Sequence, residues 1–179
     1  MMTDTQRTMV KVGSVIKTMP RRDKIKTSEY LLEGAVPVID QSVKFIAGYI
    51  NDESRAYEGP LPVIVFGDHT CIFKYINFRF AVGADGTQLI RPKDENEFDV
   101  RYLYYSLRNV PLEQFGYQRH FKYLKEGVIV QRSLEEQVKI ADVLAVYDDL
   151  IEANLRKNDL LAKARDFLIP QLLNDAIEV

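Results

Sequence analysis

The pattern of apolar and polar positions changes character at about residue 132. Before that point, short apolar runs rich in β-branched and aromatic residues alternate with Gly, Pro, Asn and Asp, which is typical of short strands joined by turns. The strands predicted in this way are Val36–Ile39, Val63–Phe66, Cys71–Phe73, Phe78–Val82 and Thr87–Ile90, with a turn at Gly83–Gly86. Asp99–Arg108 predicts a short helix, because Val100, Leu103, Tyr104 and Leu107 share one face.

After residue 132 the apolar residues recur at intervals of three and four, which predicts one long helix ending or kinking at Pro170. Ser133 and Glu136 have the spacing of a capping box, in which the hydroxyl accepts the Glu136 amide and the carboxylate reaches the Ser133 amide. A helix of roughly 37–40 residues is about 55–60 Å long at 1.5 Å per residue. One small domain leaves much of such an apolar stripe uncovered, so we expect the helix to pair with a second copy or a partner.

The predicted contact positions on this helix follow its apolar stripe. They are Ile140, Leu144, Tyr147, Ile151, Asn154, Asn158, Leu161 and Leu168. Asn154 and Asn158 lie one turn apart, on or beside the stripe. They would either fix the register of a helix pair or flank the seam in water, and the pattern fits both interpretations.

Charge divides the chain at the same point. Residues 1–132 hold 19 Lys and Arg against 16 Asp and Glu, whereas residues 133–179 hold 5 against 10. Opposite net charges can indicate different partners for the two parts, although small net charges are common in any protein. The sequence therefore predicts an α+β fold, with a sheet of short strands in 1–132 and a long C-terminal helix in 133–179.

The residues that would support catalysis or metal binding are few. Cys71 is the only cysteine, and the glycine-rich, nucleophile and zinc-ligand motifs of common enzyme classes are absent from the sequence. Asp68, His69, Cys71 and a distant His120 could be assembled into a site, but nothing in their spacing requires it. A polar N-terminus and the lack of a long apolar run predict a soluble, cytoplasmic protein that does not contact membrane.

Two segments have the composition of a nucleic-acid contact. Lys17–Lys26 holds five basic residues and one acid around Pro20, and predicts an exposed loop that neutralises phosphates or is merely solvated. Tyr117–Lys125 interleaves basic residues, an amide and aromatic residues. These side chains suit contacts with the bases and phosphates of DNA, and the aromatic residues suit a scaffold role equally well. The candidate DNA contacts are Arg21, Arg22, Lys24, Lys26, His69, Lys74, Tyr117, Gln118, Arg119, His120, Lys122 and Lys125.

Seven segments together resemble the specificity subunit of type I restriction–modification enzymes, in order and spacing. They are Gly34–Ile39, Val63–Thr70, Phe78–Gly86, Tyr117–Leu124, Glu135–Leu144, Asp148–Asn154 and Arg165–Leu173. One departure is Gln131–Ser133, which stands where the family usually carries a proline-rich approach to the helix. The second is that full-length members have two recognition domains and two spacer helices, so this chain resembles a half-length form.

The resemblance implies a division of labour. Residues 1–132 would be a target-recognition domain that reads half of a split site in double-stranded DNA, and 133–179 would be a spacer and dimerisation coiled-coil helix. Two copies would pair antiparallel as a homodimer and read a palindromic site. The helices would dock modification subunits, which bind S-adenosylmethionine and methylate adenine, and possibly restriction subunits; this chain itself would hold no cofactor or metal and catalyse nothing. The alternatives are an assembly or decoy protein that reads no DNA, and a small nuclease with a metal at Asp40 or Asp68.

Overall fold

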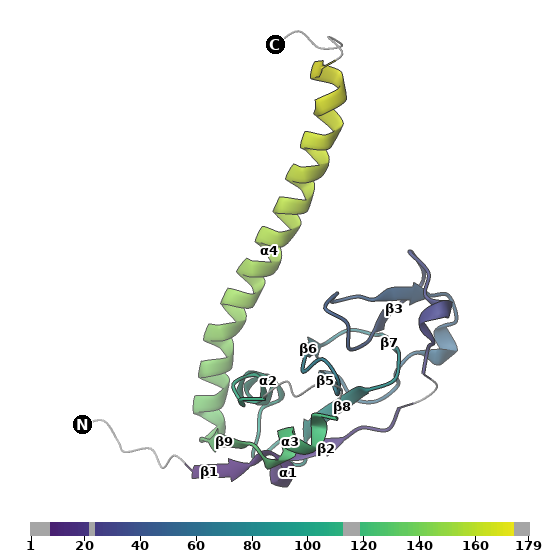
Figure 1. Cartoon of the computed structure of the whole chain (residues 1–179). Helices are drawn as coiled ribbons and strands as arrows, with labels where there is room; N and C mark the ends of the chain where they lie inside the picture. Colours follow the sequence, from purple (N-terminus) through teal and green to yellow (C-terminus); the bar gives the residue numbers. More distant parts are fainter. Residues whose placement is uncertain (1–7, 22–23, 113–118, 174–179) are drawn as a thin grey trace, which may run out of the picture. The chain divides into compact units, whose positions relative to one another are not determined.

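A computed structural model describes residues 8–21, 24–112 and 119–173 of the chain (Figure 1). The chain divides into two compact units, Met1–Val138 and Lys139–Val179. The first unit contains all the strands and short helices described here. The second unit consists of the greater part of one long helix.

Within the described residues, short strands of the first unit form three small sheets. The strands are β1 (Thr8–Lys11), β2 (Ile16–Thr18), β3 (Val36–Ile39), β4 (Gly48–Ile50), β5 (Val63–Gly67), β6 (Phe73–Ile76), β7 (Ala81–Val82), β8 (Thr87–Pro92) and β9 (Val128–Gln131). The largest sheet is antiparallel in the order β2-β8-β5-β6, and a second has the order β4-β3-β7, with β3 and β7 parallel. The third pairs β1 with β9, so it joins the beginning and the end of the first unit.

The helical elements connect these strands. They are α1 (Val12–Val15), α2 (Val100–Arg108), α3 (Phe121–Glu126), α4 (Leu134–Leu173) and two short 3-10 turns, η1 (Thr27–Glu29) and η2 (Glu53–Arg55). Asp99 caps α2, since its carboxylate accepts a 2.8 Å hydrogen bond from the Tyr102 amide. The helix predicted at Asp99–Arg108 is therefore confirmed, with Val100, Leu103, Tyr104 and Leu107 buried on the predicted face.

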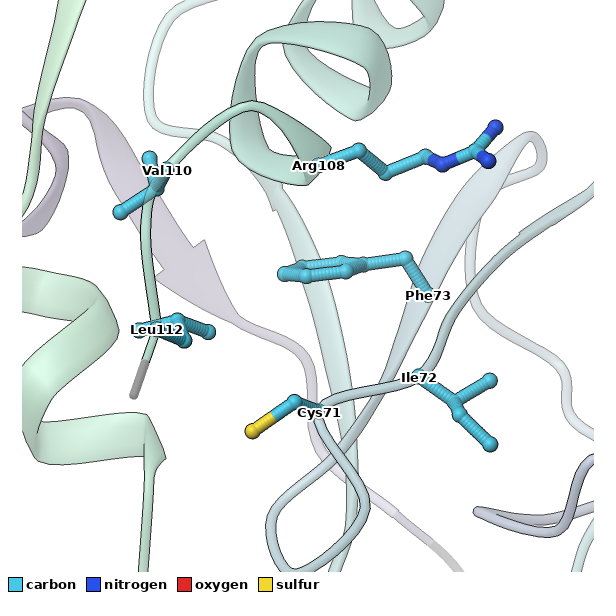
Figure 2. A pocket seen from close by; sticks show the side chains of 6 residues that line it. All are labelled: Cys71, Ile72, Phe73, Arg108, Val110 and Leu112. Carbon is cyan, nitrogen blue, oxygen red and sulfur yellow. The ribbon is translucent and has the colours of Figure 1, made fainter. Parts of the chain in front are cut away.

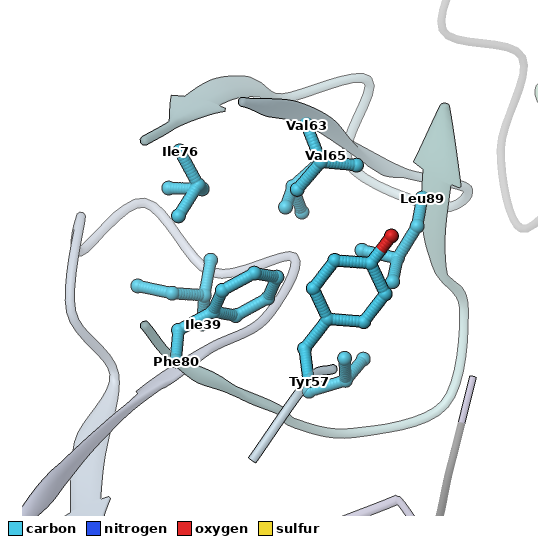
Figure 3. Packing of buried hydrophobic residues seen from close by; sticks show 8 residues of the cluster. Ile39, Tyr57, Val63, Val65, Ile76, Phe80 and Leu89 are labelled. Atoms are coloured by element: carbon cyan, nitrogen blue, oxygen red, sulfur yellow. The ribbon is translucent and has the colours of Figure 1, made fainter. Parts of the chain in front are cut away.

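One apolar cluster joins the two larger sheets. Every residue of β5 is buried, and the alternation of side chains along a strand sends Val63 and Val65 to the same face. Figure 3 shows these two valines with Ile76 and Leu89 on one side, facing Ile39, Phe80 and Tyr57 on the other. Burial of these large side chains is the main driving force for packing the two sheets against each other.

The predicted strands at Val36–Ile39, Val63–Phe66 and Thr87–Ile90 are confirmed as β3, β5 and β8. The strand predicted at Cys71–Phe73 is wrong, because β6 begins only at Phe73. Cys71 adopts a left-handed φ of 56°, and its amide donates to the Gly67 carbonyl to close a turn. Only the last two residues of Phe78–Val82 are in a strand. The predicted turn at Gly83–Gly86 is present.

Two polar residues fix the beginning of α4 within the first unit. The Ser133 hydroxyl accepts from the Glu136 amide at 3.4 Å, as the capping box predicts, but it donates to the Glu136 carboxylate at 3.1 Å in place of the expected bond to the Ser133 amide. Gln137 is fully buried, and its side-chain amide bonds to the Asp99 amide, the Glu97 carbonyl and the Arg132 carbonyl at 2.7–2.9 Å. One side chain therefore joins the first turn of α4 to the segment before α2.

The long helix does not end at Pro170, one of the two outcomes predicted there, because α4 continues through this residue to Leu173. The other outcome, a kink at Pro170, stays a prediction. Proline removes one amide donor, and three further helical residues follow it here. At 1.5 Å per residue, its 40 residues span about 60 Å. Among the described residues, none of the helices combines the length and the apolar character needed to cross a membrane.

Replacing Gln137 with Ala is expected to lower the free energy of unfolding by about 2 kcal/mol, because it leaves the Glu97 and Arg132 carbonyls and the Asp99 amide without this partner. Urea unfolding of the whole chain measures this loss. Val138→Ala is the control, since the neighbouring side chain is 44% exposed and its truncation should change the stability by less than about 0.5 kcal/mol. Equal stability of the two variants would contradict the anchoring role.

Candidate nucleic-acid interface

A cleft of about 370 Å³ in the first unit brings together residues that are distant in sequence. Its lining residues are Arg21, Lys24, Asp68, His69, Asp85, Gly86, Gln88 and Arg119. Arg21 and Lys24 come from the first segment predicted to contact nucleic acid, and Arg119 comes from the second. The fold thus places parts of both predicted segments at one site.

Backbone pairing positions the first basic segment. After β2 the chain continues beside β8, where the Met19 amide donates to the Leu89 carbonyl at 2.9 Å. Arg21 then donates through its guanidinium to the Thr87 carbonyl. The predicted exposed loop is therefore only partly correct, because Lys17 and Thr18 belong to β2 and Arg21 is half-buried.

A second backbone contact places Lys24. The Ile25 amide donates to the Val82 carbonyl at 3.0 Å, and the Ile25 carbonyl accepts from the Ala84 amide at 3.0 Å. Ile25 is fully buried, so this segment is held by packing as well as by hydrogen bonds. Its neighbour Lys24 is consequently held beside the turn that joins β7 to β8.

That turn, Gly83–Gly86, forms one wall of the cleft. Ala84 and Gly86 have left-handed φ values of 47° and 80°. A Cβ atom on Gly86 would lie 2.7 Å from His69 Cδ2 and 2.9 Å from Gln41 Nε2, so both the backbone angle and the space favour glycine. The Asp68 amide donates to the Gly86 carbonyl at 2.7 Å, which fixes the turn against the loop after β5.

Gln41 holds three loops of the site together. Its Nε2 donates to the Asp85 carbonyl at 2.8 Å, and its Oε1 accepts from the His69 amide at 3.1 Å. The Gln41 carbonyl also accepts from the Thr70 hydroxyl at 2.7 Å. The chain after β3 therefore fixes the positions of Asp85 and His69, two of the residues that line the cleft.

Asp68 holds the second basic segment. Its carbonyl accepts from the His120 amide at 2.9 Å and lies 3.0 Å from the His120 Nδ1, and its carboxylate accepts from the Phe121 amide at 2.8 Å. His120 is 1% exposed. The prediction that His120 contacts DNA is therefore corrected: this ring is inside the protein, where it holds the start of α3 and the neighbouring Arg119 at the cleft.

Opposite charges meet on the cleft wall. The Lys24 ammonium forms an ion pair with the exposed Asp85 carboxylate. The hydrogen bond from Lys24 and its positive charge, with smaller contributions from Arg21 and Arg119, lower the pKa of Asp85 below its ordinary value. Asp85 is therefore fully ionised at neutral pH, and three cations lie close enough to influence it.

Apart from Lys74, the other predicted contact residues divide into two groups. Lys26, Lys122 and Lys125 are exposed but do not line the cleft, and the Lys125 ammonium lies 4.4 Å from the centroid of the Phe121 ring. Arg22, Tyr117 and Gln118 lie outside the described residues. The sequence interpretation missed Asp85 and Gln88, although the predicted turn at Gly83–Gly86 and the strand after it already marked their position.

Lys74 requires a correction. Its side chain is 3% exposed, and its ammonium donates to the Asp40 carbonyl at 2.8 Å and the Lys44 carbonyl at 2.6 Å. The Asp40 carboxylate lies 3.9 Å away, and burial lowers the pKa of Lys74 despite this neighbour. The Lys74 ammonium, which was expected to contact DNA, instead lies inside the protein and bonds to the loop between β3 and β4.

The carboxylates proposed for a nuclease centre have structural partners. Asp40 accepts from the Tyr30 hydroxyl at 3.1 Å and the Ser42 amide at 2.8 Å. Asp68 accepts from Phe121, as described above. Across residues 8–21, 24–112 and 119–173, no group of three or more His, Cys, Asp or Glu side chains is arranged to hold a metal ion. The nuclease interpretation therefore has no support from this geometry.

A second pocket, of about 390 Å³, adjoins Cys71. Figure 2 shows its lining of Cys71, Ile72, Phe73, Arg108, Val110 and Leu112. The thiol of Cys71 and the guanidinium of Arg108 point away from each other (Figure 2), and Arg108 donates to the Tyr104 hydroxyl at 3.1 Å. Burial, and then the charge of Asp68, raise the pKa of Cys71, which disfavours the nucleophilic thiolate.

Comparisons with known proteins agree on one family. The family profile described as "Type I restriction modification DNA specificity domain" matches residues 6–162. The specificity subunit of the type I restriction enzyme EcoR124I/EcoR124II from Escherichia coli is 29% identical over 104 residues, which cover 57% of this chain and 26% of that protein. This chain thus aligns with about a quarter of the length of that curated relative.

Two solved structures share the fold. The S subunit of a type I restriction-modification system from M. genitalium matches with a TM-score of 0.73 and 20% identity, over 95% of this chain and 46% of that chain. A chain from a study of complex assembly and conformational transition of the type I R-M system matches with a TM-score of 0.58 and 18% identity, over 94% and 45%. The α+β architecture with a long C-terminal helix is therefore confirmed as that of the S subunits.

Replacing Lys74 with Met is expected to lower the free energy of unfolding by about 2–3 kcal/mol, because two carbonyl oxygens and a buried carboxylate lose their partner. Lys44→Met, which removes the same charge from an exposed side chain, should cost less than about 0.5 kcal/mol. A stable Lys74→Met variant whose DNA binding has become less sensitive to salt would instead support the original prediction of a phosphate contact.

The stability of the wild-type chain should also depend on the protonation of Lys74. Because its folded pKa is lowered, the unfolded state binds this proton more tightly than the folded state does. The free energy of unfolding should therefore rise with pH between the lowered folded pKa and the ordinary value of 10.5. Unfolding titrations of the wild type and of Lys74→Met should diverge in this window, and parallel curves would contradict the assignment.

Proposed function

The chain belongs to the family of type I restriction modification DNA specificity domains, and we propose that it is a DNA-reading specificity subunit of a type I restriction–modification system. In this proposal the first unit reads half of a split site in double-stranded DNA. The long helix pairs with a second copy and docks an adenine methyltransferase, which binds S-adenosylmethionine, and a restriction subunit. The chain itself supplies recognition and geometry but no catalytic group, and acts in the cytoplasm.

The observation that carries this proposal is the cleft. Arg21 and Lys24 reach it from one segment and Arg119 from another, and backbone hydrogen bonds hold both segments beside the cleft. Cations held in this way lose little conformational freedom when they bind phosphate or a base edge, which favours tight and oriented binding. An assembly protein that reads no DNA has no need of such a constellation.

Gln88 is the best candidate in the cleft for reading a base. It lies on β8, opposite Phe66 of β5, so its backbone is fixed in the largest sheet. A carboxamide can bond to N6 and N7 of adenine, and an arginine such as Arg21 or Arg119 can bond to O6 and N7 of guanine. The lining therefore includes donors and acceptors that suit base edges as well as charges that suit phosphates.

The second unit supports pairing because its apolar residues are uncovered. In the described chain, the exposed large apolar residues along it have 37–78% of their surface accessible. They include Tyr147 at 60%, Ile151 at 56%, Leu155 at 63%, Leu161 at 57% and Phe167 at 67%. An isolated helix with so much exposed apolar surface is stabilised by association with another apolar surface.

Two heptad rows of mostly apolar residues run along α4, about 103° apart around the helix. The first row is Ile140, Tyr147, Asn154, Leu161 and Leu168, and the second is Val146, Ala153, Leu160 and Phe167. Each row is extended by the residues that lie four positions later in the sequence. Together these positions cover an arc of about 155° around the helix at the 3.5-residue period of a coiled coil. This arc is wider than one helix–helix seam, which suits a helix that contacts both a second copy and a further subunit. Asn154 falls within the first row, where it can select the register.

The decisive experiment is co-expression of this chain with a type I modification subunit, followed by mapping of N6-methyladenine in the host DNA. The expected result is a split motif methylated on both strands and lost when this chain is omitted. A palindromic motif supports the homodimer, whereas an asymmetric motif indicates a second, different recognition domain. Stable binding of the two proteins without new methylation would favour the decoy function.

Arg119→Ala is expected to weaken binding of the chain to duplex DNA about ten-fold. Loss of a phosphate contact should also reduce the slope of log affinity against log salt by about 0.9, whereas loss of a guanine contact should affect only the cognate sequence. Arg79→Ala is the matched control, because Arg79 is exposed, pairs with Glu53 and does not line the cleft. Fluorescence anisotropy at several salt concentrations measures both quantities, and equal effects of the two variants would contradict the site.

Ile151→Lys is expected to convert a dimer of the chain into a monomer, because it places a charge within the exposed apolar arc of α4. Asp159→Lys is the control: Asp159 lies on the opposite side of α4, where it forms a 2.6 Å ion pair with Lys163. Light scattering after size-exclusion chromatography distinguishes the two states. A wild-type chain that is monomeric at every concentration would contradict pairing of α4 with its own copy.

A further inference from the structure

An acidic side chain lines the proposed DNA site. Asp85 is on the cleft wall and pairs directly with Lys24. Among its lysine, arginine and acidic residues, the lining holds three cations against the two carboxylates of Asp68 and Asp85. Asp68 is buried and bonded to the Phe121 amide, so Asp85 is the carboxylate of the lining that is exposed to an incoming ligand.

This ion pair differs from an ordinary surface pair in how its partners are held. Lys24 adjoins Ile25, which is hydrogen-bonded on both sides to the strand and turn from Val82 to Ala84. Asp85 follows that same turn, and its carbonyl accepts from Gln41 at 2.8 Å. Both backbones are therefore fixed before the side chains meet, so the pair loses less conformational entropy than two freely moving side chains would.

We propose, on the basis of the DNA-reading function above, that Asp85 is an internal substitute for a DNA phosphate: it neutralises Lys24 in the free protein and must be displaced when DNA binds. A carboxylate and a phosphate oxygen accept the same bond from an ammonium group. The interaction between Lys24 and Asp85 is lost whichever DNA sequence binds. Its loss therefore lowers the affinity for non-specific DNA, and discrimination between sequences is left to the groups that contact base edges.

The proposal has a signature in the dependence on salt. When a lysine neutralises a DNA phosphate, a cation condensed on the DNA is released to the solution, so the affinity falls with salt. When DNA displaces Asp85 from Lys24, the freed carboxylate leaves one negative charge that retains a cation in the site, so there is little net release of cations at this position. The wild-type chain should therefore show a shallower salt dependence than a variant in which Lys24 is free.

Asp85→Asn tests this inference in the full chain, with a short duplex of random sequence as the probe. The amide keeps the shape and the backbone bonds of the residue but removes the charge. We expect binding about three- to five-fold tighter at low salt. The salt slope should be steeper by about 0.9 between about 50 and 200 mM salt. In a Lys24→Ala background, Asp85→Asn should lose most of its effect, because the interaction it removes is already absent.

Glu53→Gln is the matched control. It removes one negative charge from an exposed ion pair of the same unit, with Arg79, and Glu53 does not line the cleft. Unchanged binding by this variant supports the proposal, whereas an equal gain would show an effect of net charge alone and overturn it. Unchanged or weaker binding of the random duplex by Asp85→Asn would also overturn it.

A loss confined to the duplex with the methylated motif would make Asp85 an acceptor for the cytosine amino group, which likewise contradicts the proposal. Failure of the wild-type chain to bind any duplex, with its fold intact, would instead count against the DNA-reading function itself. Thermal unfolding of each variant shows whether its fold is unchanged. These readings separate the failure of the inference from the failure of the function on which it rests.

Discussion

The proposed site depends on one feature, the backbone around the turn between β7 and β8. Gly83 and Ala84 donate to Ile39 and Ile25, Gly86 accepts from Asp68, and Asp85 accepts from the side chain of Gln41. Three segments distant in sequence thus bond to a few consecutive residues, and each of them brings or supports a residue of the cleft. Because buried peptide groups are costly to leave unpaired, these bonds fix the relative positions of the loops more strongly than side-chain packing alone would.

This feature explains which parts of the structure followed from the sequence. β3, β5, β8, α2 and α4 were predictable because their apolar patterns are local and their caps and turn residues are distinctive. β1, β2, β4 and β9 were missed, and two of these, β1 and β9, exist by pairing with each other across nearly the whole first unit. Pairing between distant segments leaves little signal in either segment. Cys71 is the opposite case: the local apolar pattern predicted a strand from this residue, but its left-handed backbone conformation does not fit one.

The candidate site was predictable in composition more than in geometry. Both basic segments contribute to the cleft, yet Lys74 and His120 proved to be buried, and Asp85 and Gln88 were not expected. Lys24 and Lys74 are equivalent as charges in the sequence. One is exposed beside a carboxylate, and the other donates to two carbonyl oxygens inside the protein. Lys24 adjoins Ile25, which pairs with the turn after β7, whereas Lys74 lies within β6 and pairs with β5. The environment of each lysine therefore depends on the backbone pairing of its segment, which a count of charges does not contain.

The small net charge of the chain is consistent with a site of this kind. Cations clustered without acids would bind every phosphate backbone strongly and would make sequence discrimination a minor part of the affinity. In a cleft with nearly balanced charge and fixed polar groups, hydrogen bonds with base edges supply a larger share of the binding free energy. These hydrogen bonds lose more free energy at a mismatched base pair than phosphate contacts do. The two units differ in the same terms: the first restrains its charges by backbone hydrogen bonds and an ion pair, whereas the second exposes apolar surface, which the proposed partners would cover.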